Sequence, residues 1–132
     1  MTFSLKLFLQ ELATALDAAA DVDQGIDNIT LSTPGRRKQT IYARIRESGI
    51  GGEMILFYTP VGPFTQGIDC ASLLELNVGT IYARAGLIDG RIVIVAGQLV
   101  EKANIPEAVT MLNEVSTLGD ILENLLFGQD QF

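Results

Sequence analysis

The chain has 132 residues, a formal net charge of −7 and 48 % apolar residues. This length suits one domain with its own core, so we expect a single domain over residues 1–132. The acidic charge argues against nucleic acid and against anionic membranes as partners, because both require clustered Lys and Arg. The apolar excess, set against only 19 % charged residues, means either that the core is unusually efficient or that some apolar surface faces a partner, and we give weight to the second explanation.

The first half of the chain predicts one helix followed by strands. Ser4–Ala20 has leucines at helical spacing and a polar opposite face, which predicts an amphipathic helix. Asn28–Ser32 is a short strand candidate, and Thr40–Arg46 alternates apolar and polar residues as a half-buried antiparallel strand does. Glu53–Thr59 is apolar on both faces, which is typical of a central strand, and Pro60–Pro63 is expected to end it.

A short helix is predicted next, over Asp69–Asn77. Asp69 suits the N-cap position, because its carboxylate can accept a free backbone N–H of the first turn. Leu73, Leu74 and Leu76 are expected to form the buried side of this helix.

A hairpin follows, made of the predicted strands Thr80–Leu87 and Arg91–Ala96. The pair Asp89-Gly90 is the strongest hairpin signal in the sequence, because a type I′ turn needs positive φ at both central residues. The turn therefore predicts that the two strands are antiparallel neighbours.

The closing helix is predicted over Asn104–Phe127. Asn104 and Glu107 have the spacing of a capping box. Gly119 weakens the middle of the helix, so a kink or a split at this point stays open. The predicted order is thus α-β-β-β-α-β-β-α, an α+β fold with a mostly antiparallel sheet and helices on its faces.

One pentapeptide occurs twice, as Thr40–Arg44 and as Thr80–Arg84. The copies could form matched Tyr/Arg surfaces on equivalent hairpins, but two strands that obey the same inside–outside alternation explain the identity better. With an aromatic residue of the first helix, these positions are our candidate partner-binding residues: Phe8, Tyr42, Arg44, Tyr82 and Arg84.

The sequence offers little for catalysis. It has no histidine, the residue most used for acid–base chemistry and for zinc, and its one cysteine, Cys70, is interpreted as inert. Gly49–Gly52 lacks the Lys-Ser or Lys-Thr of a phosphate loop, and the acids Asp21, Asp23 and Asp27 miss the EF-hand spacing. We therefore expect no enzymatic activity, no cofactor and no metal.

The cellular location follows from the same residues. A single cysteine excludes an intramolecular disulfide and fits a reducing compartment. No signal peptide is recognised over Met1–Gln10, and the longest apolar runs, Met54–Tyr58 and Ile92–Ala96, are too short to span a bilayer. We therefore expect a cytoplasmic protein.

The element order resembles that of type III secretion chaperones that bind single effectors. The stretch that carries the resemblance runs from the helix Ser72–Asn77 through the hairpin Ala85–Ala96 to the amphipathic segment Leu99–Leu126. One departure is Leu99–Glu101, where such proteins often have Leu-Pro. The same fold also occurs in bacterial proteins that have no secretion system.

The resemblance implies a homodimer that holds an extended segment of a partner polypeptide. We therefore expect a non-catalytic protein-binding domain, with part of the apolar face of the first helix or a free sheet edge as its docking surface. For the leucines of that face, ordinary core packing is the better explanation: Leu5, Leu9, Leu12 and Leu16. The alternatives are a small-molecule or enzymatic domain with a pocket between sheet and helices, and a structural subunit of a fixed complex.

Overall fold

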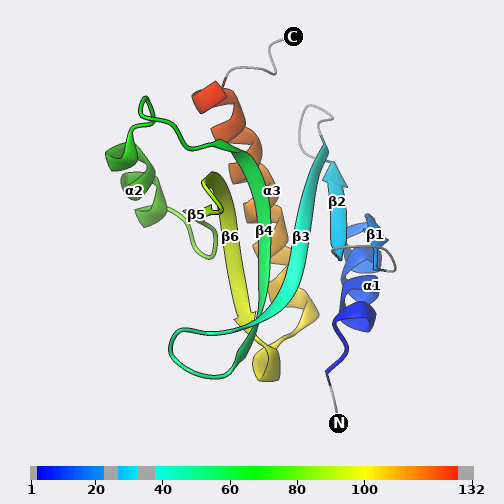
Figure 1. Ribbon diagram of the computed structural model, residues 1–132. Helices are drawn as coiled ribbons and strands as arrows, with labels where there is room; N and C mark the ends of the chain where they lie inside the picture. Colours follow the sequence, from blue (N-terminus) through cyan, green and yellow to red (C-terminus); the bar gives the residue numbers. More distant parts are fainter. Residues whose placement is uncertain (1–2, 23–26, 33–37, 128–132) are drawn as a thin grey trace.

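The computed structural model describes residues 3–22, 27–32 and 38–127 (Figure 1). The helices are α1 (Leu5–Leu16), α2 (Cys70–Val78) and α3 (Ile105–Phe127), with a short 3-10 turn η1 (Val100–Lys102) before α3. The strands are β1 (Ala19–Asp21), β2 (Asn28–Ser32), β3 (Lys38–Glu47), β4 (Glu53–Pro63), β5 (Arg84–Ile88) and β6 (Arg91–Leu99).

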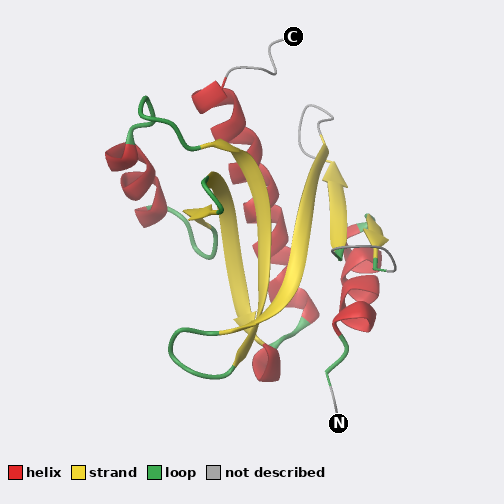
Figure 2. Ribbon diagram, viewed as in Figure 1, coloured by secondary structure: helices red, strands yellow, loops and turns green. Residues whose placement is uncertain are grey.

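All six strands form one antiparallel sheet in the order β1-β2-β3-β4-β6-β5. The long helix α3 crosses one face of this sheet behind β3, β4 and β6, while α1 lies at the β1–β2 end and α2 beside β5 (Figure 2). The predicted α+β class with a mostly antiparallel sheet is therefore confirmed. The opposite face of β3, β4 and β6 has no helix across it among the described residues, and we call it the open face.

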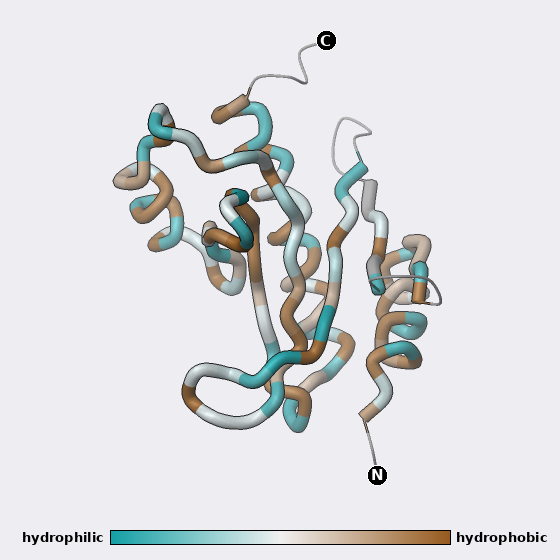
Figure 3. The backbone as a smooth tube through the Cα atoms, viewed as in Figure 1, coloured by the Kyte–Doolittle hydropathy of each residue, from teal (hydrophilic) through white to brown (hydrophobic). Residues whose placement is uncertain are grey.

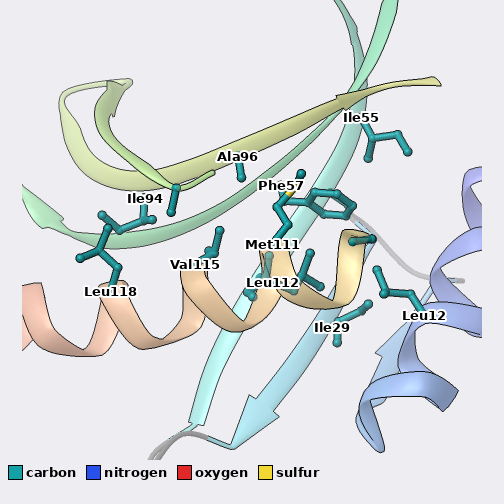
Figure 4. Packing of buried hydrophobic residues seen from close by; sticks show 14 of the residues in the cluster. Leu12, Ile29, Ile55, Phe57, Ile94, Ala96, Met111, Leu112, Val115 and Leu118 are labelled. Atoms are coloured by element: carbon teal, nitrogen blue, oxygen red, sulfur yellow. The ribbon is translucent and has the colours of Figure 1, made fainter. Parts of the chain in front are cut away.

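The core lies between α3 and the sheet (Figure 4). Ala43 is paired with Phe57, which in turn is paired with Ala96, so these three buried side chains share the face toward α3. From the helix, Met111 and Val115 reach the same layer. Alternate residues of the strands and the apolar face of α3 thus supply the side chains of one apolar layer.

Helix α3 is continuous through Gly119, so no split occurs there. A Cβ atom on Gly119 would lie 2.9 Å from Cγ2 of Thr59, closer than real Cβ atoms approach. The Thr59 hydroxyl is buried within hydrogen-bond distance of Gln39 Oε1 (3.1 Å) and of the Thr40 carbonyl oxygen (2.9 Å). Glycine therefore lets α3 approach the sheet at a buried polar contact.

The end of the first helix differs from the prediction. Helix α1 ends at Leu16, because Asp17 adopts the left-handed conformation (φ 53°) and its N–H caps the carbonyls of Ala13 and Thr14. The alanines that follow, predicted to be helical, instead form β1, which pairs with β2. Pairing with a neighbouring strand outweighs the helix propensity of alanine here, and it adds one strand to the predicted order.

Two strand boundaries also differ from the prediction. Strand β4 continues through Pro60 to Pro63, with a register shift between Pro60 and Gly62. Proline lacks the N–H that a regular ladder needs, and a bulge removes that requirement locally. Strand β5 begins only at Arg84, so the segment Thr80–Ala83, predicted to be a strand, is a loop.

The predicted turn and the predicted N-caps are confirmed. Asp89 and Gly90 both have positive φ, 50° and 76°, as a type I′ turn requires. Asp69 caps α2 by accepting the backbone N–H of Ser72 at 3.3 Å. At the start of α3, Asn104 Oδ1 accepts the N–H of Glu107 at 2.9 Å. The capping box predicted for α3 forms only in part, because the Glu107 carboxylate accepts from Tyr82 and Gln98 instead of from the backbone.

Candidate protein-interaction surface

Helix α2 is only loosely covered by the rest of the chain. None of its nine residues is fully buried, although Leu73 and Leu76 pack partly against the core. Leu74, predicted to be buried, is 67 % exposed, which corrects the prediction for that residue. Figure 3 shows that apolar residues recur along this helix. A helix with apolar side chains on both sides is typical of an element that packs against a further surface.

Half of the large apolar side chains that are exposed in the described part of the chain come from residues 64–87. Leu74 and Leu87, with Phe64, line an apolar groove of about 180 Å³ between α2 and β5. Val78 lies one helical turn beyond Leu74 and is 86 % exposed. We call the following set the α2–β5 surface: Phe64, Leu74, Val78, Ile81 and Leu87. Clustered exposed apolar side chains are typical of a protein-interaction site.

Strand β5 is also an edge of the sheet. It pairs with β6 along one side only, and its other side has no strand partner in the described residues. With five residues, from Arg84 to Ile88, it is a short edge, beside which α2 lies (Figure 1). An edge of this kind exposes backbone N–H and carbonyl groups that another chain can pair with.

The loop between α2 and β5 is fixed to α3 by one carboxylate. Glu114 accepts the backbone N–H groups of Ile81 (2.9 Å), Tyr82 (2.6 Å) and Ala83 (2.7 Å). Partial burial opposes the charge on Glu114, but these three bonds and the positive charge of Arg84 outweigh it and lower the pKa of the carboxyl. The loop is therefore held by an ionised Glu114 at neutral pH.

A second carboxylate secures the same region. Glu107 accepts the hydroxyl of Tyr82 at 3.1 Å and the side-chain amide of Gln98 at 2.8 Å. The bond to Glu107, with burial and the charges of Glu107 and Glu114, raises the pKa of the Tyr82 phenol. Tyr82 thus already has partners within its own chain.

Arg84 is likewise engaged inside the chain. Its Nη1 donates to the Thr80 hydroxyl oxygen at 2.7 Å and to the carbonyl oxygen of Ala83 at 2.8 Å. The two copies of the repeated pentapeptide are therefore not equivalent: Thr40–Arg44 lies inside β3, whereas Thr80–Ala83 forms a loop.

Tyr42 and Arg44 lie together on the open face of the sheet. The ring of Tyr42 lies 5.5 Å from the ring of Tyr58, which is the residue opposite it on β4. The guanidinium of Arg44 covers the same Tyr58 ring, with Cζ 4.8 Å from its centroid. Of the five candidate residues, Tyr42 and Arg44 therefore lie on one shared surface. Tyr58 belongs to the same surface, although the sequence identified it only as part of a central strand.

Phe8 stands apart from the other candidates, on α1. It is half-buried, its ring lies 5.5 Å from that of Phe3, and it packs partly against the core. Part of the α1 stripe is also core, since Leu9 and Leu12 are fully buried. Only a fraction of Phe8 is therefore available to a partner.

The space between sheet and α3, where a pocket would support the small-molecule alternative, contains the packed side chains of Phe57, Met111 and Val115 (Figure 4). Cys70 is exposed and lies at the rim of the apolar groove. Within the described residues, no three acidic or Cys side chains lie close enough together to hold a metal ion. In the same part of the chain, no helix has the length and hydropathy to cross a bilayer.

The sequence analysis did not identify the α2–β5 surface. Its signal was present in α2, where Glu75 is the one charged residue among nine and apolar residues occupy more than one side. We assigned the three leucines to a single buried face, and the covering elements turn out to reach only Leu73 and Leu76.

No protein family model matches this sequence, and no curated protein matches it either. Solved structures do match. The first is the Yersinia pestis type III secretion chaperone SycH in complex with a stable fragment of YscM2, with a TM-score of 0.57 and 13 % identity over 92 % of this chain and 99 % of that chain. The second is the HopA1–SchA chaperone–effector complex, with a TM-score of 0.55 and 14 % identity over 90 % and 95 %.

Proposed function

We propose that this chain, which has the fold of type III secretion chaperones, is a non-catalytic protein-binding subunit. In this proposal it pairs with a second copy of itself through the α2–β5 surface, and the pair holds an extended segment of a partner polypeptide. Both structural matches are complexes of a chaperone with a protein fragment or an effector. The observation that carries the proposal is the exposed apolar cluster on α2 and β5.

A second copy suits this surface for electrostatic reasons. Two chains of net charge −7 repel each other, so they pair most readily through a surface that is poor in charge. The nine residues of α2 contain one charged side chain, Glu75, and the groove beside it is lined mainly by apolar side chains. Stable homodimer interfaces are apolar in this way, and a two-fold pair buries the same patch on both copies.

The cytoplasm is the compartment that fits the thiol chemistry. Cys70 is a free and exposed thiol at the rim of the groove. Such a thiol persists in a reducing compartment, whereas an oxidising one would favour cross-linking of two chains at this residue.

Light scattering after size-exclusion chromatography tests the pairing. The wild-type protein is expected at twice the monomer mass of 14.2 kDa, and Leu74→Asp at the monomer mass, because the new charge would be buried at the interface. Leu125→Asp is the matched control, since Leu125 is 72 % exposed on α3 and lies outside the α2–β5 surface. A monomeric wild type at all concentrations would refute the pairing, and equal dissociation by both variants would refute its assignment to the α2–β5 surface.

Partner capture is tested separately. The tagged wild-type protein, expressed in its source cells, is expected to retain one polypeptide at a fixed ratio after washing in moderate salt. Limited proteolysis of the complex is then expected to leave a protected segment of that polypeptide, as an extended bound chain requires. Recovery of the homodimer alone would count against the chaperone-like role and leave the pairing intact.

A further inference from the structure

The open face of the sheet is unusually cationic for this acidic chain. Tyr42, Tyr58 and Val95 are paired with one another across β3, β4 and β6, so their side chains lie on this face. Every second residue before and after them along the strands lies on the same face. The basic residues at these positions are Lys38, Arg44, Arg46, Arg84 and Arg91. The same positions of the described strands β3 to β6 contain no Asp or Glu. More than half of the nine basic residues of a chain with net charge −7 therefore share one face.

A groove of about 490 Å³ crosses this face. From the strands β3, β4 and β6 it is lined by Tyr42, Arg44, Tyr58, Pro60 and Val93, and from the β5–β6 hairpin by Ile88, Asp89 and Arg91. The hairpin turns at Asp89 and Gly90, which fixes where Arg91 lies relative to the sheet. The groove thus combines aromatic rings with two arginines from different strands and one carboxylate, that of Asp89, so the arginines leave it with a net positive charge.

Arg44 borders this groove with its guanidinium. Its Nε is buried and has no acceptor among the described residues, while its guanidinium lies over the Tyr58 ring. Because Nε is closed to solvent, a ligand in the groove would contact the terminal nitrogens of the guanidinium instead. A carboxylate is the acceptor that best fits, because its two oxygens match the planar donors of a guanidinium.

We propose that this groove binds a carboxylate side chain from an acidic, extended segment of the partner polypeptide, with Arg44 and Arg91 as its cationic contacts. The inference that the segment belongs to a partner polypeptide rests on the proposed function. The inference that the ligand carries a carboxylate rests on the residues that line the groove. The rest of the chain repels an acidic segment, so binding depends on this local positive face and weakens as salt screens it.

Nuclear magnetic resonance on the full-length, ¹⁵N-labelled protein tests the groove directly. The probe is acetyl-Gly-Glu-Gly-Glu-Gly-amide, and the matched control is the same peptide with Gln in place of Glu. The Glu peptide is expected to shift the Nε–H signal of Arg44 and the backbone amides of Tyr42 and Arg91 in a saturable manner. Equal shifts with the Gln peptide, or shifts that are absent from these three signals, would overturn the proposal.

Substitutions locate the binding. Arg91→Gln and Arg44→Lys are each expected to weaken binding roughly tenfold, because the first removes a charge and the second removes the planar fork. Arg46→Gln is the control, since Arg46 lies on the same strand and face but does not line the groove. Arg91 is exposed, so its substitution tests the groove even where a change at Arg44 disturbs folding. Equal weakening by Arg46→Gln would overturn the assignment to this groove.

Two further readouts separate the possible sources of the carboxylate. Acetate at the same carboxylate concentration is expected to produce no saturable shift, and saturation by acetate would overturn the polypeptide as the occupant. Light scattering and partner capture report on the proposed function independently. A monomeric chain that still binds the Glu peptide would refute the pairing and support the proposed carboxylate site. A dimer that does not bind the peptide would support the pairing and refute the carboxylate site.

Discussion

The carboxylate of Glu114 accepts the backbone N–H of Ala83 at 2.7 Å, across a separation of 31 residues. With the bonds from Ile81 and Tyr82, this contact attaches the loop before β5 to the helix behind the sheet. Because the loop joins α2 to β5, Glu114 controls the geometry of the α2–β5 surface without belonging to it.

Replacement of Glu114 by Gln is expected to lower the free energy of unfolding by about 1–2 kcal/mol, since an amide oxygen accepts these N–H groups less strongly than a carboxylate. Urea denaturation at pH 7 measures the difference. Glu101→Gln is the control, because Glu101 is exposed in η1, and its substitution is expected to change stability by less than about 0.5 kcal/mol. A similar loss in both variants would contradict the role of Glu114.

The contribution of Glu114 is also expected to depend on pH. Its pKa is lowered in the folded chain, so its contribution is fully present above the ordinary glutamate pKa of about 4.3 and is lost as the pH falls through the lower folded value. The stability difference between wild type and Glu114→Gln should therefore stay constant near neutral pH and shrink in acid. Urea denaturation of both proteins from pH 7 to pH 3 checks this, and a difference that persists unchanged at pH 3 would refute it.

Gly119→Ala is expected to destabilise the chain by about 1 kcal/mol, although alanine is the better helix former. The added Cβ would lie 2.9 Å from Cγ2 of Thr59, and Thr59 cannot turn away without losing its contacts with Gln39 and Thr40. Thr59→Ser removes that methyl group and keeps the hydroxyl. In a double-mutant cycle, the paired substitution should therefore recover most of the loss, and strict additivity of the two changes would rule out the clash.

Leu74→Asp is expected to leave the stability of the isolated monomer within about 0.5 kcal/mol of wild type, because Leu74 is 67 % exposed. The melting temperature of the wild type should rise with protein concentration, as pairing requires, and that of Leu74→Asp should not. Leu73→Asp is the contrasting variant, since Leu73 packs against the core and its loss should lower stability at every concentration. Equal destabilisation by both variants at high dilution would mean that Leu74 is buried in the monomer.

Asp69→Ala is expected to destabilise the start of α2 and to fray it, because Asp69 accepts the N–H of Ser72 at the N-cap. Hydrogen exchange of the α2 amides measures the fraying. Glu75→Ala removes the same charge from the middle of α2, away from the cap, and should not speed exchange. Comparable exchange in the two variants would show that the cap contributes nothing.

The parts of the fold that follow from local chemistry could be predicted. The turn at Asp89 and Gly90 and the cap at Asp69 depend on a few adjacent residues, and each appears as expected. The mostly antiparallel sheet followed from the alternation of the strands, and the secretion-chaperone fold from a resemblance in element order, without a shared residue motif.

The remaining differences all depend on contacts between distant residues. Alanine favours a helix, but Ala19–Asp21 pairs with β2 once the chain has turned at Asp17. Thr80–Ala83 has the alternation of a strand, but Glu114 accepts the N–H groups that a ladder would have used. The exposure of Leu74 could not be predicted either, because it depends on which elements cover α2.

The position of Glu114 in the sequence has a consequence for biosynthesis. The ribosome completes α2 and the β5–β6 hairpin before it makes the middle of α3, so the loop before β5 is fixed in place only after Glu114 has been synthesised. Until then the nascent chain exposes the edge of β5 and the leucines of α2 without their final geometry. The proposed pairing through the α2–β5 surface would therefore follow the synthesis of α3.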